Sequence, residues 1–217
     1  MIHSFNTNDL TFLLLAARWT VLLALIAFIG GGVVGLIVAL GRTAKRRSIR
    51  WFFTGYIQLF QGTPLLMQLF LVFFGVNIIG FSVDPWSAAA LGLTLNASAF
   101  LGNTWAGSIR AIPVGQWEAA RAVGLKYRHV MKDVILPQAT KIAIPPTVGF
   151  MVQLLKSTSL ASIIGFTELT RAGQIVNTGT FQPFLVFGIV AAIYFALCWP
   201  LSLLSQRLER RFGTVAR

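Results

Sequence analysis

The sequence predicts an all-α integral membrane protein, built as a single transmembrane domain (residues 1–217) with five transmembrane helices. Of the 217 residues, 56% are hydrophobic and only 11% are charged, and the mean hydropathy is +0.75. This composition is too apolar for an ordinary soluble domain. Long uncharged segments alternate with segments rich in Lys and Arg, and a helix needs about 20 residues to cross a bilayer. The expected spans are residues 12–40, 52–79, 85–109, 140–163 and 183–206.

The distribution of basic residues predicts the orientation of these helices. Between the first two spans stand five basic residues without an acidic one: Arg42, Lys45, Arg46, Arg47 and Arg50. Basic residues also dominate the loop at 110–138 and the C-terminal end. Under the positive-inside rule these segments face the cytoplasm, so the N-terminus is expected in the periplasm and the C-terminus in the cytoplasm. The net charge of +12 then reflects topology rather than nucleic-acid binding.

The first two spans differ in character. The first carries Arg18 as its only charge, and a cluster of glycines in it suits the close approach of another helix: Gly30, Gly31, Gly32 and Gly35. The second span is uncharged but interrupted by Gly62-Thr63-Pro64. Because a break in lipid leaves backbone groups unsatisfied, we expect a broken helix that faces protein or a cavity. A proline kink whose freed groups bond to neighbouring helices is the alternative.

The remaining spans carry more polar groups. Asp84-Pro85 marks a short outer turn before the third span, whose hydroxyl and amide side chains suit either helix–helix bonding or a substrate pathway. The fourth span is expected to continue past Lys156, with Pro145-Pro146 bending or starting it. Glu168 and Arg171 are expected to form a solvated pair outside the membrane. The fifth span precedes the C-terminal arginines.

The loop at 110–138 is a long polar segment, rich in charge, in the interior of the sequence. In its first part the small residues share one helical face, Glu118 and Arg121 lie one turn apart and can pair, and Gly124 ends the helix. A second short helix is expected over 125–135, stopped by Pro137. Two short helices broken at glycine would present a shallow apolar ridge to a groove on a partner protein. A solvated basic loop between spans is the alternative.

Several motifs give this loop a more specific interpretation. Glu118-Ala119-Ala120, then Gly124 after three intervening residues, and Leu136-Pro137 in the expected place resemble the EAA loop of transmembrane subunits of binding-protein-dependent ABC importers. Val134 stands where that pattern usually has Ile. Further segments resemble the polar amino acid uptake branch of these permeases, over about residues 10–211: Gly62-Thr63-Pro64-Leu65-Leu66-Met67-Gln68-Leu69-Phe70, Gly115-Gln116-Trp117-Glu118-Ala119-Ala120, Leu136-Pro137-Gln138-Ala139, Pro145-Pro146 and Leu154-Leu155-Lys156-Ser157-Thr158-Ser159-Leu160.

The resemblance implies a permease subunit of the bacterial inner membrane that moves a polar amino acid by alternating access. In that family a five-helix subunit pairs with an identical or related one, two cytoplasmic ATPase subunits receive the EAA helices, and a periplasmic binding protein delivers the substrate. The residues that would couple to the ATPase are Glu118, Ala119, Ala120, Arg121, Ala122, Val123 and Gly124. The candidate pathway residues, for which helix packing is the competing explanation, are Gln61, Thr63, Gln68, Asn103, Met151, Gln153, Thr158 and Ser159.

Five positions depart from the usual pattern of this branch. Gln61 stands where Arg normally precedes Gly-Thr-Pro, and Asn103 and Ala106 replace a usual Glu and Arg. Gly149 and Ser157 occupy places where Asn and an acidic or amide residue are common. Each change removes a charge or an amide, which weakens transfer of the family's substrate site and fits one half of a heterodimer. The amino acid, the choice between homodimer and heterodimer, and the identity of the binding protein and ATPase stay open.

The sequence carries no sign of catalysis. It has no Gly-x-x-x-x-Gly-Lys-Ser/Thr segment, no His-Glu-x-x-His and no paired intramembrane carboxylates, so no catalytic or metal-binding residue is expected, and ATP and Mg²⁺ are expected in a partner ATPase. The alternative function is a stand-alone secondary carrier or channel for small polar solutes. Ion-driven carriers usually need acidic groups inside the membrane, and no Asp or Glu lies well inside an expected span.

Overall fold

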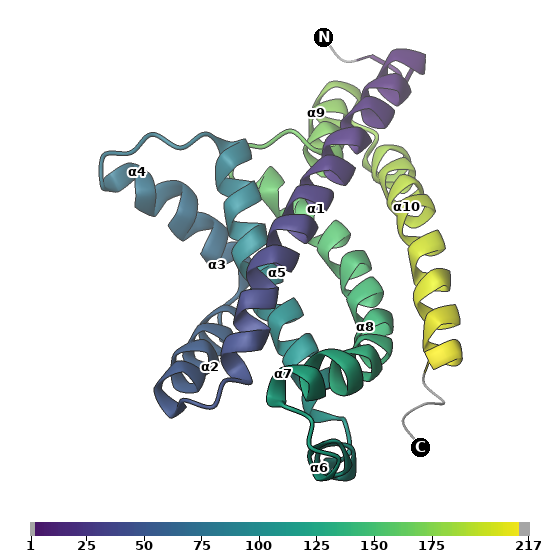
Figure 1. The fold of residues 1–217 in the computed structure, drawn as a ribbon. Coiled ribbons are helices and arrows are strands. Elements are labelled where there is room, and N and C mark those ends of the chain that lie inside the picture. Colours follow the sequence, from purple (N-terminus) through teal and green to yellow (C-terminus); the bar gives the residue numbers. More distant parts are fainter. Residues whose placement is uncertain (1–2, 213–217) are drawn as a thin grey trace.

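The computed structural model describes residues 3–212, and within that range the chain forms helices and turns without a strand (Figure 1). The all-α prediction is therefore confirmed for the described residues. Two π-helical turns, at Leu71–Gly75 and Val130–Ile135, connect consecutive helices, and a 3-10 turn at Thr158–Ser162 follows the eighth helix. The helices are α1 (Thr7–Arg42), α2 (Arg47–Gly62), α3 (Leu65–Phe70), α4 (Val76–Ile78), α5 (Pro85–Arg110), α6 (Val114–Ala122), α7 (Tyr127–His129), α8 (Leu136–Ser157), α9 (Leu169–Thr180) and α10 (Pro183–Phe212).

Helices α1 and α5 cross at close range and form the centre of the molecule (Figure 1). At the crossing Gly31 has no room for a side chain, since a Cβ added there would lie 2.5 Å from the Cβ of Ala97. The glycines of the first span therefore allow close packing, as predicted. A buried apolar core surrounds the crossing and extends to α3 and α8, and it includes Leu23, Ala27, Leu69, Leu93, Leu101, Phe150 and Leu154.

The second expected span is broken where the sequence predicted a break. Helix α2 ends at Gly62, and the chain restarts as α3 in a direction 103° away from that of α2. Thr63 and Pro64 adopt extended backbone conformations between the two helices. After α4, Asp84 caps the N-terminus of α5 by accepting from the backbone N–H of Ser87 at 3.0 Å, with Pro85 in the first helical position.

Pro137 does not stop a helix, which corrects the sequence prediction. The helical path runs from α7 through the π-helical turn Val130–Ile135 and continues past Pro137 into α8. A proline lacks the N–H that an α-helix needs, and the wider turn just before it changes the bonding of the preceding carbonyls. Pro145 and Pro146 lie inside α8 rather than at its start, and α8 follows a curved path in Figure 1.

Helix α9 lies at the end of the molecule where α1 begins, and α10 starts there and runs along the molecule toward the opposite end (Figure 1). Helix α9 lies against both α1 and α10, and the three share a second apolar core. Its C-terminus turns through Phe181, which has a left-handed φ of 51°. The buried residues of this core are Leu13, Ala16, Ala17, Leu169, Ala172, Val176, Val186 and Val190.

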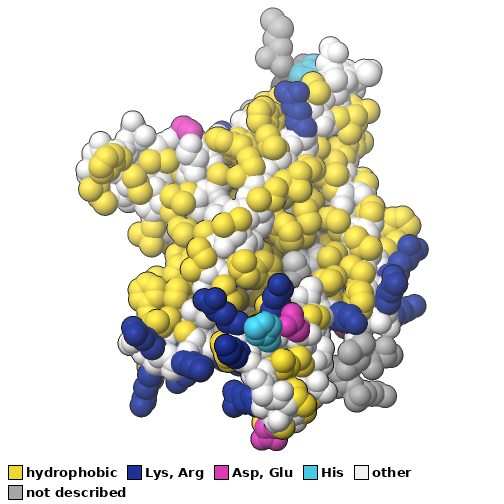
Figure 2. Space-filling model, in the orientation of Figure 1, with side chains coloured by type: hydrophobic (Ala, Val, Ile, Leu, Met, Phe, Trp, Pro, Cys, Tyr) yellow, Lys and Arg dark blue, Asp and Glu magenta, His cyan; other side chains and the backbone are white. Residues whose placement is uncertain are grey.

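The structure supports part of the expected membrane topology. Among the described residues, α1 and α10 are long and apolar enough to cross a membrane, and the bent pair of α2 with α3–α4 could supply a third span. The other two expected spans correspond to α5 and α8, which are less apolar, so the five-span topology stays a prediction. In Figure 2 apolar side chains cover the middle of the molecule, while Lys and Arg gather around the end where α2 and α6 lie.

Candidate functional site

Helix α6 and the turn that follows it carry the predicted coupling residues, and the helix ends where the sequence predicted. Gly124 has a φ of +79°, a left-handed conformation that glycine adopts at no steric cost. The N–H of Gly124 donates to the Arg121 carbonyl (2.9 Å) and the N–H of Leu125 donates to the Ala120 carbonyl (3.2 Å). This pair of bonds is the Schellman motif, which closes a helix C-terminus. The end of α6 is therefore a defined turn.

The two faces of α6 differ in exposure. Ala120 is only 6% exposed and lies in an apolar cluster with the C-terminal end of α5 and the start of α8. The other buried residues of this cluster are Ile109, Ile112, Val130, Ile135 and Ala139. The other six predicted coupling residues are exposed, and Val123 is 75% exposed. Helix α6 is thus attached to α5 and α8 through one face and presents the other outward, at the far end of the molecule in Figure 1.

Glu118 and Arg121 do not pair with each other, which corrects the sequence prediction. Both side chains are exposed, and within residues 3–212 the one contact of salt-bridge length joins the His3 ring to Asp9. An exposed pair gains little in water because each ion is already well hydrated. Both charges on α6 are consequently available to groups on another protein.

Two of the predicted pathway residues, Thr63 and Gln68, bond to each other at the break between α2 and α3. The buried Gln68 amide donates to the Phe60 carbonyl (2.8 Å), the Thr63 carbonyl (3.1 Å) and the Thr63 hydroxyl (2.9 Å). Asn96 of α5 donates in turn to the Gln68 side-chain oxygen at 3.1 Å. These bonds satisfy backbone groups that the break would otherwise leave unpaired. For Gln68 the structure therefore supplies a packing role.

A second pair, Gln61 of α2 and Asn103 of α5, lies near the C-terminal end of α1. The Asn103 amide donates to the Gln61 side-chain oxygen at 3.0 Å, and the Arg42 guanidinium donates to the Asn103 oxygen. Arg110 donates to the Arg42 carbonyl at 2.8 Å. Gln61 and Asn103 stand where the polar amino acid uptake branch usually has charged residues. Here their uncharged side chains join α2 to α5, and Asn103 also bonds to Arg42 of α1.

The other four predicted pathway residues lie on α8 and the turn after it. Thr158 is fully buried, and its hydroxyl donates to the Leu155 carbonyl at 2.7 Å. Ser159 donates to the Lys156 carbonyl at 2.7 Å, Gln153 is exposed and Met151 is half-buried. Among the described residues no hydrogen bond joins these four to the two pairs above. The structure therefore arranges the eight candidates as three groups rather than one site.

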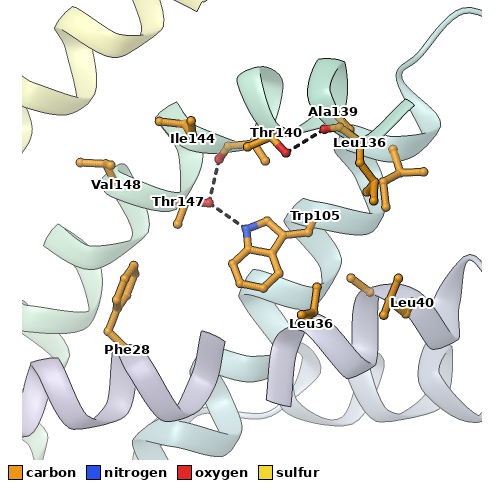
Figure 3. A pocket seen from close by; sticks show the side chains of 13 residues that line it. Phe28, Leu36, Leu40, Trp105, Leu136, Ala139, Thr140, Ile144, Thr147 and Val148 are labelled. Carbon is orange, nitrogen blue, oxygen red and sulfur yellow. Dashed lines mark hydrogen bonds between the residues drawn. The ribbon is translucent and has the colours of Figure 1, made fainter. Parts of the chain in front are cut away.

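Sequence reasoning missed an apolar cavity between α1, α5 and α8 (Figure 3). The cavity has a volume of about 420 Å³, and none of the eight predicted pathway residues lines it. Trp105 points into it, and its indole N–H donates to the Thr147 hydroxyl at 2.9 Å. Thr147 donates to the Ala143 carbonyl at 2.7 Å. Because these polar groups satisfy one another, the cavity suits an apolar occupant better than a polar one.

Glu168 is buried, which corrects the expectation of a solvated pair with Arg171. The Glu168 side chain is 0% exposed and accepts hydrogen bonds from the Tyr194 hydroxyl (2.8 Å) and from the backbone N–H groups of Thr170 and Arg171 (2.9 Å each). The Arg171 guanidinium donates to Gln174 instead. Glu168 lies outside the expected spans, and burial raises the pKa of its carboxyl, while these hydrogen bonds oppose the rise. No local sequence signal marks this residue.

The described residues contain no gathering of three or more His, Cys, Asp or Glu side chains that could hold a metal ion. The candidate functional features are therefore the outward face of α6, the hydrogen-bonded groups around Gln68 and Asn103, and the apolar cavity.

Comparison with known proteins connects this arrangement to a family. A family profile described as "Binding-protein-dependent transport system inner membrane component" matches residues 31–214. The chain is 39% identical to the L-cystine transport system permease protein TcyB of Bacillus subtilis, over 89% of this chain and 83% of that protein. It is 35% identical to a putative glutamine transport system permease protein of Rickettsia felis, over 87% of each chain. A crystal structure of an amino acid ABC transporter with histidines matches with a TM-score of 0.89 and 31% identity, over 96% of this chain and 100% of that one.

Proposed function

Since this chain belongs to the family of binding-protein-dependent transport system inner membrane components, we propose that it is the permease subunit of an ABC importer that moves a polar amino acid across the bacterial inner membrane. Amino acids are supported as the substrate class because the relatives are named as permeases for amino acids and the similar structure is that of an amino acid ABC transporter. Those relatives are named for different amino acids, so they leave the particular substrate open. ATP and Mg²⁺ would be held by separate ATPase subunits, and a periplasmic binding protein would deliver the substrate.

The observation that carries this proposal is that α6 packs on the rest of the protein through one face and exposes the other. Its outward face offers two charges, Glu118 and Arg121, that form no ion pair within residues 3–212, beside the exposed side chain of Val123. Its inward face fixes Ala120 in an apolar cluster shared with α5 and α8. A closely packed cluster transmits displacement because it has little room to deform. A movement of an ATPase that held the outward face would therefore shift α5 and α8 together, as a rigid-body step.

The substrate pathway in this proposal requires a second permease subunit, identical or related. The cavity between α1, α5 and α8 is mainly apolar, and its Trp105–Thr147 pair is internally bonded. A polar amino acid would lose its hydration there without gaining equivalent hydrogen bonds. A pathway between two subunits could instead use exposed polar groups such as Gln153. The eight candidate pathway residues are proposed on this basis, with Gln68 and Thr158 the weakest because their polar groups are already bonded internally.

The experiment that tests this function is cysteine crosslinking from α6 to candidate cytoplasmic ATPase subunits in native membranes. The background is Cys198→Ala, which removes the single cysteine of the chain. Val123→Cys places a thiol at the exposed C-terminal end of α6, and we expect it to crosslink to the ATPase with a yield that changes when ATP is added. Absence of this crosslink in membranes that contain the ATPase would remove the coupling role of α6.

Ala120→Cys is the matched control because it lies on the same helix but inside the apolar cluster. We expect at least a severalfold lower yield from this position. Transport in proteoliposomes separates the importer from the alternative carrier or channel: an importer moves amino acid only when the ATPase subunits are present. Uptake by this chain alone, driven by an ion gradient or by diffusion, would favour the alternative.

A further inference from the structure

A second pocket lies at the C-terminal end of α1 and is lined partly by basic residues and partly by apolar ones. Its volume is about 440 Å³, and it is formed where α1 and α5 end, where α2 begins, and where α6 and α7 meet them. Arg42, Arg50 and Arg110 line it. The rest of the lining is mostly apolar or aromatic, and includes Trp117 and Met131. A pocket of this kind suits an anionic group attached to an apolar body.

No acidic side chain among the described residues balances the three arginines. Arg110 donates to the Arg42 carbonyl at 2.8 Å, and Arg50 donates to the Ala44 carbonyl at 3.3 Å. Arg42 donates to Asn103, and its Nε atom is buried without a hydrogen-bond partner within residues 3–212. Every one of these acceptors is neutral. Positive charges held together without an anion repel one another, so a bound anion would stabilise the arrangement.

The position of the pocket relative to the expected membrane favours a lipid headgroup as the source of such an anion. Arg42 is the last residue of α1, directly after its apolar stretch, and the positive-inside rule assigns this end to the cytoplasm. Lys45 lies nearby, with its ammonium 4.7 Å from the centre of the Tyr127 ring. In Figure 2 Lys and Arg gather at this end of the molecule. Basic clusters and pockets at the cytoplasmic ends of membrane helices attract anionic lipid headgroups.

We propose that this pocket binds the phosphate group of an anionic phospholipid from the cytoplasmic leaflet. Arg42, Arg50 and Arg110 surround the phosphate, since guanidinium groups bind phosphate oxygens with paired N–H donors. Trp117 and Met131 contact the glycerol and the first acyl carbons, an apolar contact that a free phosphate ion cannot make. The lipid would then lie between α1 and the base of α6, where it holds the coupling helix in position.

Native mass spectrometry of the purified full chain tests this site. The probes are phosphatidylglycerol, phosphatidylcholine and inorganic phosphate, each titrated separately. We expect one phosphatidylglycerol to bind at least about tenfold more tightly than phosphatidylcholine, and Arg50→Gln with Arg110→Gln to weaken that binding by about tenfold or more, the order expected for two basic residues at an anionic lipid surface. Arg50→Gln alone serves as a milder variant, because the Arg50 side chain is exposed and makes only long hydrogen bonds.

The matched control is Arg46→Gln with Arg47→Gln, which removes the same charge from exposed residues that do not line the pocket. We expect this control to retain the preference for phosphatidylglycerol, and size-exclusion profiles check that every variant is folded. Equal binding of phosphatidylcholine, or an equal loss in the control, would overturn the proposal in favour of a diffuse surface charge. If inorganic phosphate bound and phosphatidylglycerol were not preferred, the pocket would be a site for a free anion, and the lipid proposal would be wrong. If none of the three probes bound, the proposal of a lipid site would be wrong, and the arginines would instead be expected to pair with acidic groups of a partner protein.

Discussion

The hydroxyl of Tyr194 in α10 donates a 2.8 Å hydrogen bond to Oε2 of Glu168, which lies at the start of α9. The same carboxylate caps α9 by accepting from the backbone N–H groups of Thr170 and Arg171. The hydroxyl of Thr20 in α1 lies 3.5 Å from Oε2 of Glu168. One buried carboxyl group therefore joins α9 and α10, which are consecutive, to α1 at the other end of the sequence, and its bonds fix how α9 and α10 lie against α1.

Removing the Tyr194 hydroxyl should destabilise the protein. Tyr194→Phe leaves a buried carboxylate with one donor fewer, which typically costs about 1–3 kcal/mol. We expect a lower thermal midpoint in detergent, measured by circular dichroism. Tyr127→Phe is the matched control because Tyr127 is exposed and its ring contacts the Lys45 ammonium through its face, which phenylalanine retains. Equal effects of the two substitutions would show that the bond to Glu168 contributes nothing specific.

The buried carboxyl should also make stability depend on pH. Burial raises the pKa of Glu168 above its ordinary value of 4.5, so the folded protein holds this proton more tightly than the unfolded chain does. The stabilising contribution is therefore full below pH 4.5 and is lost as the pH rises through the folded pKa. We expect the thermal midpoint of the wild type to fall relative to that of Glu168→Gln as the pH rises from about 4 to 8, because the glutamine does not titrate. A difference that stays constant with pH would contradict this.

A side chain at Gly31 should separate the central helices. The added Cβ of Gly31→Ala would lie 2.5 Å from the Cβ of Ala97, and the next nearest contacts are backbone atoms at 3.2 Å. Because backbone cannot move aside without shifting a helix, we expect a loss of about 1–3 kcal/mol, the usual cost of overpacking. The measurement is the thermal midpoint in detergent. Gly32→Ala is the control, since its nearest neighbour would lie at 3.7 Å, and Ala97→Gly should partly rescue Gly31→Ala.

The turn after α6 should depend on Gly124. Nothing lies within 4 Å of a Cβ added there, so the cost of Gly124→Ala comes from its φ of +79°. A left-handed conformation costs a residue with a side chain about 1–2 kcal/mol. We expect faster amide hydrogen exchange over α6 and a lower crosslinking yield from Val123→Cys. Gly115→Ala also has open space around it, and within a helix it should leave exchange unchanged or slow it. Faster exchange in both variants would point to a different cause.

Local features of this fold are predictable from the sequence because their causes are local. Gly62-Thr63-Pro64 breaks a helix through its own backbone restrictions, and the structure has a bend of 103° there. Asp84-Pro85 starts a helix, and Gly124 ends one, for similar reasons. The exposure of Val123 beside the buried Ala120 follows from helical periodicity only once the partner of each face is known.

The features that sequence analysis missed depend on contacts between distant segments. Glu168 is buried because Tyr194 and Thr20, from two other helices, enclose it, and nothing beside Glu168 in the sequence indicates this. The apolar cavity is lined by residues of α1, α5 and α8, which are brought together only in the folded protein. The path through Pro137 likewise depends on a π-helical turn that hydrophobic spacing does not reveal.

The role of Gln68 separates a structural residue from a pathway residue. Its amide makes three hydrogen bonds at the break after α2, and its oxygen accepts from Asn96. Gln68→Leu would leave several buried polar groups unpaired, and we expect a loss of about 1–3 kcal/mol in the free energy of unfolding. Replacing both Gln68 and Asn96 by Leu should recover part of this, because the buried Asn96 amide, which loses its bond to the Gln68 oxygen, is then removed as well. The exposed Gln153→Leu should change stability by less than about 0.5 kcal/mol. If Gln68→Leu instead abolished transport in proteoliposomes while leaving unfolding unchanged, the packing role would be contradicted, because the four hydrogen bonds of Gln68 would then contribute nothing to stability, and Gln68 would stay a candidate for the substrate pathway.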